Sequence, residues 1–525
     1  MKSYYTHLKS TNEYGEKKTL TKKPILRSSG IFPVMHNSNY STKIHFLGYW
    51  LLKRKIPEVS LTITLRDKSG KKLLRELEII NETKAYTIFL KELLEKINYN
   101  AEFVGSIETE FNTTRDMVFP YPALVLEYFN EKFNTCVHTL GRVYNDFEDI
   151  NENEEFKVPE TGFDIYETEN LSSFLSFVNG PLVNNDGCIE YVITNSNSQK
   201  FSGNFKLDKI NPFETKHILF GEHIPDLSKF LDGDHGSISL KHSFEGFYPR
   251  FLVGNIQKSF PSVSFTHSYY DCTNCLNETD FWNRVNDKHY DSTVYVPIFN
   301  KDNQFTNLMI YPNFSPSNFE LEIQIFDSNG KMVFNKPNFL EINQSGSKLI
   351  EINFNKILAE NKLSDEFYAS QVITNFKGEK IPARIKFGLN IGVSGLKSEL
   401  PCNICFNTKM GNPLIENKPG SFHWAPIFPK RNSVITIGNF STMKDYHKDA
   451  NIELNFYQMK NNQNISKKLF LKANSEERIF INQHQDLKDF LLDEGWITIK
   501  ADNPYIQGYY FHLNESGSVS GDHFF

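Results

Sequence analysis

Residues 61–70 read LTITLRDKSG. Apolar and polar side chains alternate through the first five positions, which is typical of a strand with one buried face. Asp67, Ser69 and Gly70 then supply a turn, because these residue types tolerate left-handed backbone or hydrogen-bond around it. Residues 321–330 repeat the pattern as LEIQIFDSNG. The sequence therefore predicts the same β-hairpin at two distant places.

Two landmarks recur along the whole chain with nearly the same period. The polar turn recurs in steps of 128, 132 and 132 residues, at Asp67, Asn195, Asp327 and about Met459. A basic residue ahead of a short helical stretch recurs in steps of 132, 132 and 130 residues, at Lys84, Lys216, Lys348 and Arg478. A period of about 130 residues is too long for a solenoid unit and suits a small domain. The chain is therefore predicted to be one module written four times.

Each period carries the same order of strand and helix signals. It opens on an apolar strand, at residues 31–35, 174–178, 294–299 and 424–428, and closes on a hairpin. About seven strands and one short helix per period predict an all-β fold. We expect four tandem immunoglobulin-like antiparallel β-sandwich modules of about 110–130 residues, at 25–146, 162–272, 292–409 and 421–525.

The composition narrows the possible classes of protein. The 525 residues include 46 Phe and 24 Tyr, which suit sandwich cores and argue against disorder. Each module is long enough to bury a core of its own. The net charge of −6 offers no basic excess for nucleic-acid phosphates, so a nucleic-acid partner is not expected.

The targeting signals are negative. The first 24 residues lack the apolar segment of a secretory signal, and no apolar run reaches the roughly 18 residues of a membrane span. We expect a cytoplasmic protein. The alternative of export by a route that needs no N-terminal signal stays open. Residues 45–52 are aromatic and precede Lys53-Arg54-Lys55. They can form an interfacial anchor or a buried strand that ends in a solvated loop, and we favour the strand.

A histidine recurs near the end of the last strand in three modules. His138, His267 and His523 take this place, and Asn407 takes it in the third module. In the first two modules a tyrosine and an aspartate follow, giving the candidate binding residues His138, Tyr144, Asp146, His267, Tyr270, Asp271 and His523. Such a set can bind a polar ligand or handle protons. The alternative, which we favour, is that these residues are copied structural features of the strand ends.

Two Cys-x-x-Cys pairs, Cys272/Cys275 and Cys402/Cys405, lie 130 residues apart. Four thiolates can hold one zinc ion, and the first pair can do so with His267. Cys402 and Cys405, however, fall in a predicted strand, where residues three apart point to opposite faces. Free thiols are therefore the main expectation, with no metal and no cofactor.

No nucleotide-binding loop, zincin motif or nucleophile elbow occurs in the sequence. We therefore expect a non-enzymatic binding or scaffold protein that recognises a glycan or a partner protein. One alternative is an enzyme that acts on a glycan or another polar substrate through the His/Tyr/Asp set. A second alternative is a self-associating structural subunit, since repeated sheet edges favour assembly.

Overall fold

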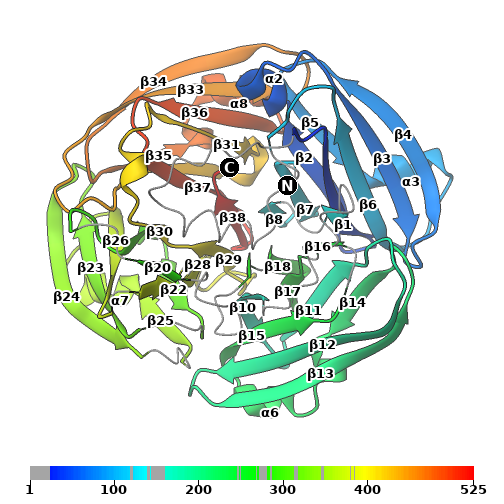
Figure 1. Cartoon of the computed structure of the whole chain (residues 1–525), viewed down its shortest axis with the longest axis horizontal. Coiled ribbons are helices and arrows are strands. Elements are labelled where there is room, and N and C mark those ends of the chain that lie inside the picture. The colour runs from blue at the N-terminus through cyan, green and yellow to red at the C-terminus, as the bar shows by residue number, and fades with distance from the viewer. Residues whose placement is uncertain are drawn as a thin grey trace. The chain divides into compact units, whose positions relative to one another are not determined.

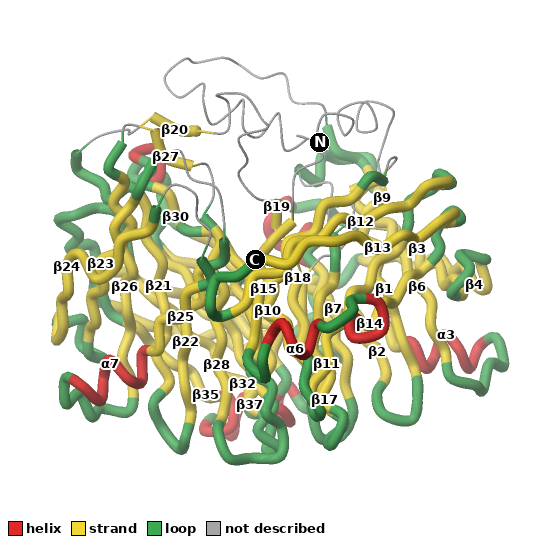
Figure 2. Tube along the Cα trace, turned by 90° about the horizontal axis from the view of Figure 1, so that it is seen from below, coloured by secondary structure: helices red, strands yellow, loops and turns green. Residues whose placement is uncertain are grey.

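The computed structural model describes residues 24–118, 122–138, 142–143, 160–244, 247–248, 250–267, 269–270, 281–283, 287–312, 317–343, 348–378, 380–382 and 385–525. Strands make up most of this part of the chain (Figure 2). Internal contacts divide the chain into two compact units. The first unit is Met1–Tyr270 with Met459–Asn462, and the second is Asp271–Gln458 with Gln463–Phe525.

The first two modules each contain eight main strands (Figure 1). Those of the first module are β1 (Arg27–His36), β2 (Ser41–Leu47), β3 (Val59–Asp67), β4 (Lys72–Ile80), β5 (Ala85–Phe89), β6 (Phe103–Asn112), β7 (Leu124–Phe129) and β8 (Asn134–His138). Those of the second module are β10 (Glu160–Tyr166), β11 (Leu171–Val178), β12 (Asn184–Asn195), β13 (Lys200–Ile210), β14 (Thr215–Leu219), β15 (His235–His242), β17 (Leu252–Gln257) and β18 (Ser262–His267).

The last two modules repeat this set. The third module has β21 (Ser292–Phe299), β22 (Gln304–Ile310), β23 (Phe319–Phe326), β24 (Met332–Ile342), β25 (Ile350–Asn353), β26 (Phe367–Phe376), β28 (Lys386–Val393) and β29 (Cys402–Asn407). The fourth has β31 (Ser421–Ile427), β32 (Ser433–Asn439), β33 (Ala450–Gln458), β34 (Asn464–Leu471), β35 (Glu476–Phe480), β36 (Gly495–Ala501), β37 (Ile506–Leu513) and β38 (Val519–His523).

All four modules share one topology. One sheet has the order first, sixth, third and fourth strand, and the other has the order fifth, second, seventh and eighth, with every pair antiparallel. The second–fifth and third–sixth pairings also occur in immunoglobulin sandwiches. The predicted all-β fold of four tandem β-sandwiches is therefore confirmed, with eight strands per module where the sequence indicated about seven.

Short helices and minor strands complete the modules. A helical segment follows the fifth strand in each: α3 (Leu90–Lys96), α5 (Phe220–His223) with α6 (Leu227–Leu231), α7 (Phe354–Glu360), and η4 (Ile481–Gln483) with α8 (Gln485–Leu491). Helix α7 lies at one end of the strands of its module (Figure 2). The minor elements are β9 (Arg142–Val143), β16 (Phe247–Tyr248), β19 (Tyr269–Tyr270), β20 (Phe281–Asn283), β27 (Lys380–Pro382), β30 (Lys409–Met410), η2 (Pro413–Ile415) and η3 (Pro429–Arg431).

The predicted turns form as their residue types indicate. Asp67 Oδ1 accepts hydrogen bonds from the backbone amides of Ser69 and Lys71, at 2.9 and 3.1 Å. Asp327 does the same for Asn329 and Lys331, at 2.9 and 3.0 Å. The repeat seen in the sequence is therefore a repeat of hydrogen-bonded hairpins.

Two local predictions were wrong. Residues 174–178 belong to β11, the second strand of its module, and the first strand is β10. The aromatic stretch 45–52 does not continue as a strand, because it breaks at Gly48 and becomes helix α2 (Tyr49–Arg54). Trp50 and Tyr49 are buried there, so this short helix is held by packing more than by its own propensity.

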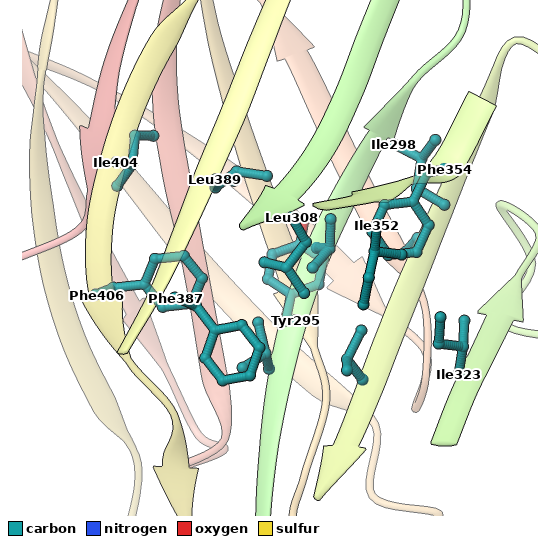
Figure 3. Packing of buried hydrophobic residues seen from close by; sticks show 14 of the residues in the cluster. Tyr295, Ile298, Leu308, Ile323, Ile352, Phe354, Phe387, Leu389, Ile404 and Phe406 are labelled. Atoms are coloured by element: carbon teal, nitrogen blue, oxygen red, sulfur yellow. The ribbon is translucent and has the colours of Figure 1, made fainter. Parts of the chain in front are cut away.

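The interior of the third module continues into the fourth. Side chains such as Leu308, Phe387 and Ile404 converge between its two sheets (Figure 3). The same buried cluster includes Phe440 and Phe511 of the fourth module. The expectation of a separate core in every module therefore fails for the second unit, where two sandwiches share apolar contacts.

The first two modules are joined through the turn that follows β3. The Lys68 carbonyl accepts a hydrogen bond from the Thr215 amide at 3.0 Å, and the Arg66 guanidinium lies 4.1 Å from the Phe213 ring centroid. The equivalent turn of the third module brings Gly330 against Ala473 of the fourth. Each unit is therefore built by docking the third–fourth-strand turn of one module onto the next module.

Within the described residues, no helix combines the length and the apolar character needed to cross a bilayer.

Candidate functional site

A row of four paired residues crosses the second sheet of every module. It starts in the fifth strand, two residues before the cap of the following helical segment. The rows are Thr87–His45–Val125–His138, His217–Ser176–Leu252–His267, Glu351–Met309–Gly388–Cys405 and Arg478–Thr436–Tyr509–His523. Directly paired residues of an antiparallel sheet share a face, so each row lies on one side of its sheet.

The rows fix which residues correspond between modules. His138, His267 and His523 occupy the same register position and are each the last residue of their strand, as the sequence predicted. In the third module that position holds Cys405, and Asn407 lies two residues further along. The correspondence proposed for Asn407 was therefore wrong by two residues, because β29 extends past the register position where the other three strands end.

His138 and His267 come together in the first unit. Their ring centroids are 4.2 Å apart with an interplanar angle of 84°, and the side chains are only 7% and 1% exposed. Next to them the Phe265 amide donates to Thr135 Oγ1 at 3.3 Å. The last strands β8 and β18 therefore meet, so two residues 129 positions apart form one buried pair.

Only part of the remaining predicted His/Tyr/Asp set lies within the described residues. Tyr144, Asp146 and Asp271 lie outside the described residues. Tyr270 belongs to β19, whose backbone pairs with β10 at Glu160. The last member, His523, accompanies Asp522 at the end of β38, where its Nδ1 lies 2.9 Å from the Phe524 carbonyl oxygen.

A second buried polar group, which the sequence analysis missed, occupies the first module. His45 Nε2 lies 2.7 Å from Glu127 Oε2, and His45 Nδ1 lies 3.0 Å from Thr87 Oγ1. Asn134 donates to the other carboxylate oxygen of Glu127 at 2.9 Å. His45 and Asn134 therefore give both oxygens of the buried Glu127 side chain a hydrogen-bond partner. Glu127 was detectable as the one acidic residue within an otherwise apolar strand.

The second module also pairs a histidine with a hydroxyl in its row, but the two strands are exchanged. The histidine is on the fifth strand and the hydroxyl on the second, whereas the first module has them the other way round. Ser176 Oγ lies 2.7 Å from His217 Nδ1. Burial, together with the nearby positive charge of Lys68, lowers the pKa of His217 from 6.5 to about 4. His217 therefore stays neutral in the folded protein at neutral pH and bonds Ser176 in that form.

This shift predicts an acid-sensitive first unit. A base whose folded-state pKa is lowered contributes stability that is present above pH 6.5 and is lost as the pH falls toward about 4. We expect the wild-type chain to lose on the order of 1–2 kcal/mol more than the variant His217→Asn between pH 7 and pH 4.5. Urea unfolding at both pH values measures the difference, and equal losses would contradict the shift.

One of the two Cys-x-x-Cys pairs lies within the described residues. Cys402 and Cys405 both lie in strand β29, as the sequence predicted, and both side chains are buried. Burial raises the pKa of the Cys402 thiol to about 12, so it is not a thiolate at neutral pH. Cys272 and Cys275 lie outside the described residues.

Comparison with known proteins gives no close relative. No protein-family model matches the chain, and no curated protein matches it. One similar solved structure is the tetra-tandem repeat in the extending region of a large adhesion protein, with 7% identity and a TM-score of 0.10 over 89% of this chain and 91% of that chain. Another is the M60 catalytic domain with the CBM51-1 and CBM51-2 domains from Clostridium perfringens ZmpB, with 8% identity and a TM-score of 0.13 over 92% of this chain and 53% of that chain. TM-scores this low assign the chain to no family. The tandem β-sandwich fold is established by the strand order of its own sheets.

Proposed function

We propose that the chain is a non-enzymatic binding or scaffold protein that recognises a glycan or a partner protein. The observation that carries this proposal is that reactive side chains are buried while the edge strands are exposed to solvent. Groups able to do chemistry lie in the packed interior of the first unit, whereas long strands at the sheet edge carry exposed side chains.

Burial of the reactive groups supports binding over catalysis. His45, Glu127, His138 and His267 are all buried. None of these four side chains is more than 7% exposed in the described part of the chain. An enzyme would instead gather such groups in an open pocket that holds its substrate.

The fourth strand of each module supplies the exposed surface. Strands β4, β13, β24 and β34 stand at the edge of their sheets and are exposed at half or more of their positions. Leu77 on β4 is 67% exposed and Phe470 on β34 is 57% exposed. Exposed apolar side chains next to polar neighbours suit contacts with sugar rings or with a partner surface.

The charge of strand β13 favours a partner over self-assembly. Strand β13 carries three lysines and one aspartate, a net charge of 3 − 1 = +2, in a chain whose net charge is −6. Lysines on an edge strand oppose edge-to-edge pairing of identical chains. They attract acidic ligands, so acidic glycans are the first class to test.

The test is binding to an array of neutral and acidic glycans. We expect saturable binding, with Leu77→Ser or Phe470→Ser weakening it about tenfold, or ~1.4 kcal/mol. Leu414→Ser is the matched control, because Leu414 is similarly exposed but belongs to η2 and not to a fourth strand.

Two results would contradict the proposal. One is chemical change of the bound ligand, seen by mass spectrometry after long incubation, which identifies an enzyme. The other is sedimentation that grows with protein concentration while no ligand binds, which identifies a self-assembling subunit.

A further inference from the structure

The register position of His138, His267 and His523 holds a side chain that can bind a metal ion in all four modules. It is histidine in three modules and Cys405 in the third. Cysteine does not replace the hydrogen bonds of an imidazole, because its thiol is a weak donor and a weak acceptor. Histidine and cysteine are, however, both common ligands of zinc and related ions. The pattern of replacement therefore points to metal ligation more than to a copied hydrogen bond.

The first unit brings two of these positions into contact. The imidazole nitrogens offered by His138 and His267 lie within 4.8 Å of one another. Two imidazoles on one tetrahedral ion, each at about 2.1 Å, have nitrogens roughly 3.4 Å apart. The two nitrogens must therefore approach each other by at most about 1.4 Å. Rotation of one imidazole ring about its side-chain bonds can supply this movement.

We propose that His138 and His267 together bind one divalent transition-metal ion of the zinc, cobalt or nickel type. Neutral imidazole is the ligand form, and both rings are held on neighbouring strands, which reduces the entropy lost on binding. Two histidines leave coordination positions for water or further donors. This site goes beyond the proposed function, because glycan or partner binding at the fourth strands does not require it.

The experiment uses the full chain after removal of metals with a chelator. Titration with Co²⁺ is expected to give one ion per chain, visible absorption bands and a higher thermal midpoint. His138→Ala and His267→Ala are each expected to weaken binding about a hundredfold. His36→Ala is the control, because His36 lies in the same unit but bonds Ser41 Oγ at 3.0 Å.

A conservative variant keeps the test informative if the alanine variants do not fold. His267→Cys is expected to keep the ion and to add a thiolate-to-cobalt charge-transfer band. This band appears only if residue 267 ligates the ion, so a purely structural role of position 267 would not produce it. The proposal is overturned if the wild-type chain binds no stoichiometric Co²⁺. It is also overturned if folded alanine variants bind as the wild type does, or if the His267→Cys chain shows no thiolate band.

Discussion

Gly70→Ala is expected to lower the free energy of unfolding of the first unit by roughly 3 kcal/mol. Gly70 has φ +87°, and a Cβ atom there would lie 2.2 Å from the Pro212 carbonyl oxygen and 2.8 Å from the Phe213 carbonyl carbon. The left-handed backbone costs about 1–2 kcal/mol for a residue with a side chain. The remainder comes from pushing apart two backbones that already share a hydrogen bond from Thr215 to Lys68.

The control separates these two contributions. Gly233 has φ +75° and nothing within 4 Å of a Cβ atom, so Gly233→Ala carries only the backbone cost. The second unit offers a matched pair, since Gly330 and Gly395 both have φ +79°. A Cβ atom at Gly330 would lie 2.6 Å from the Ala473 carbonyl oxygen, whereas Gly395 has open space. Chemical unfolding that gives equal losses for Gly70→Ala and Gly233→Ala would show that the turn does not hold the modules together.

The local part of this architecture was predictable because turn chemistry is local. Asp67 and Gly70 supply a side-chain acceptor and a left-handed residue within four positions of one another. The same residue types recur at Asp327 and Gly330 and form the same hairpin. The sequence could not indicate that each turn also docks on the next module. A glycine is expected at this position of the turn whether or not the turn contacts another module.

The missed elements are those whose burial comes from distant partners. Strand β10 has the sequence ETGFDIY, with no regular alternation, yet Glu160, Thr161 and Asp164 are all buried. Helix α2 has six residues, too few to show a helical period. In both segments the sequence pattern is short or irregular, and tertiary packing determines the conformation.

The candidate site was predictable by position but not by contact. The repeat located His138 and His267 at equivalent strand ends, which the register confirms. It could not show that the first and second modules bring those strands together. The His45–Glu127 pair joins residues 82 positions apart, so only the isolated Glu127 in an apolar strand gave any signal.

Arg478→Ala is expected to destabilise the second unit by about 3–5 kcal/mol, because it leaves a buried carboxylate without its cation. The Arg478 guanidinium pairs with Glu476 and donates to the backbone carbonyls of Ile298 and Tyr368, at 2.9 Å each. It also lies 4.5 Å from the Phe299 ring centroid. Since Arg478 belongs to the fourth module and these carbonyls to the third, its loss weakens the contact between the two modules.

Measurements of pH dependence distinguish this mechanism from lost packing. Burial raises the pKa of Glu476, and Arg478 opposes that rise, so removing Arg478 raises the pKa further. A carboxyl group with a raised folded-state pKa favours folding below its ordinary pKa and loses that benefit as the pH rises through the folded value. The deficit of Arg478→Ala should therefore shrink as the pH falls from 7 toward about 4.5. The added substitution Glu476→Gln should recover part of it at neutral pH.

An exposed ion pair in the same unit is the control. Lys301 and Glu366 lie 3.0 Å apart with side chains 47% and 54% exposed. Lys301→Ala should change the free energy of unfolding much less than Arg478→Ala does, because solvent screens that pair. If Arg478→Ala cost as little, or if its deficit did not change with pH, the buried Arg478–Glu476 pair would not be what joins the third and fourth modules. The shared apolar contacts of Phe440 and Phe511 would then have to supply that connection.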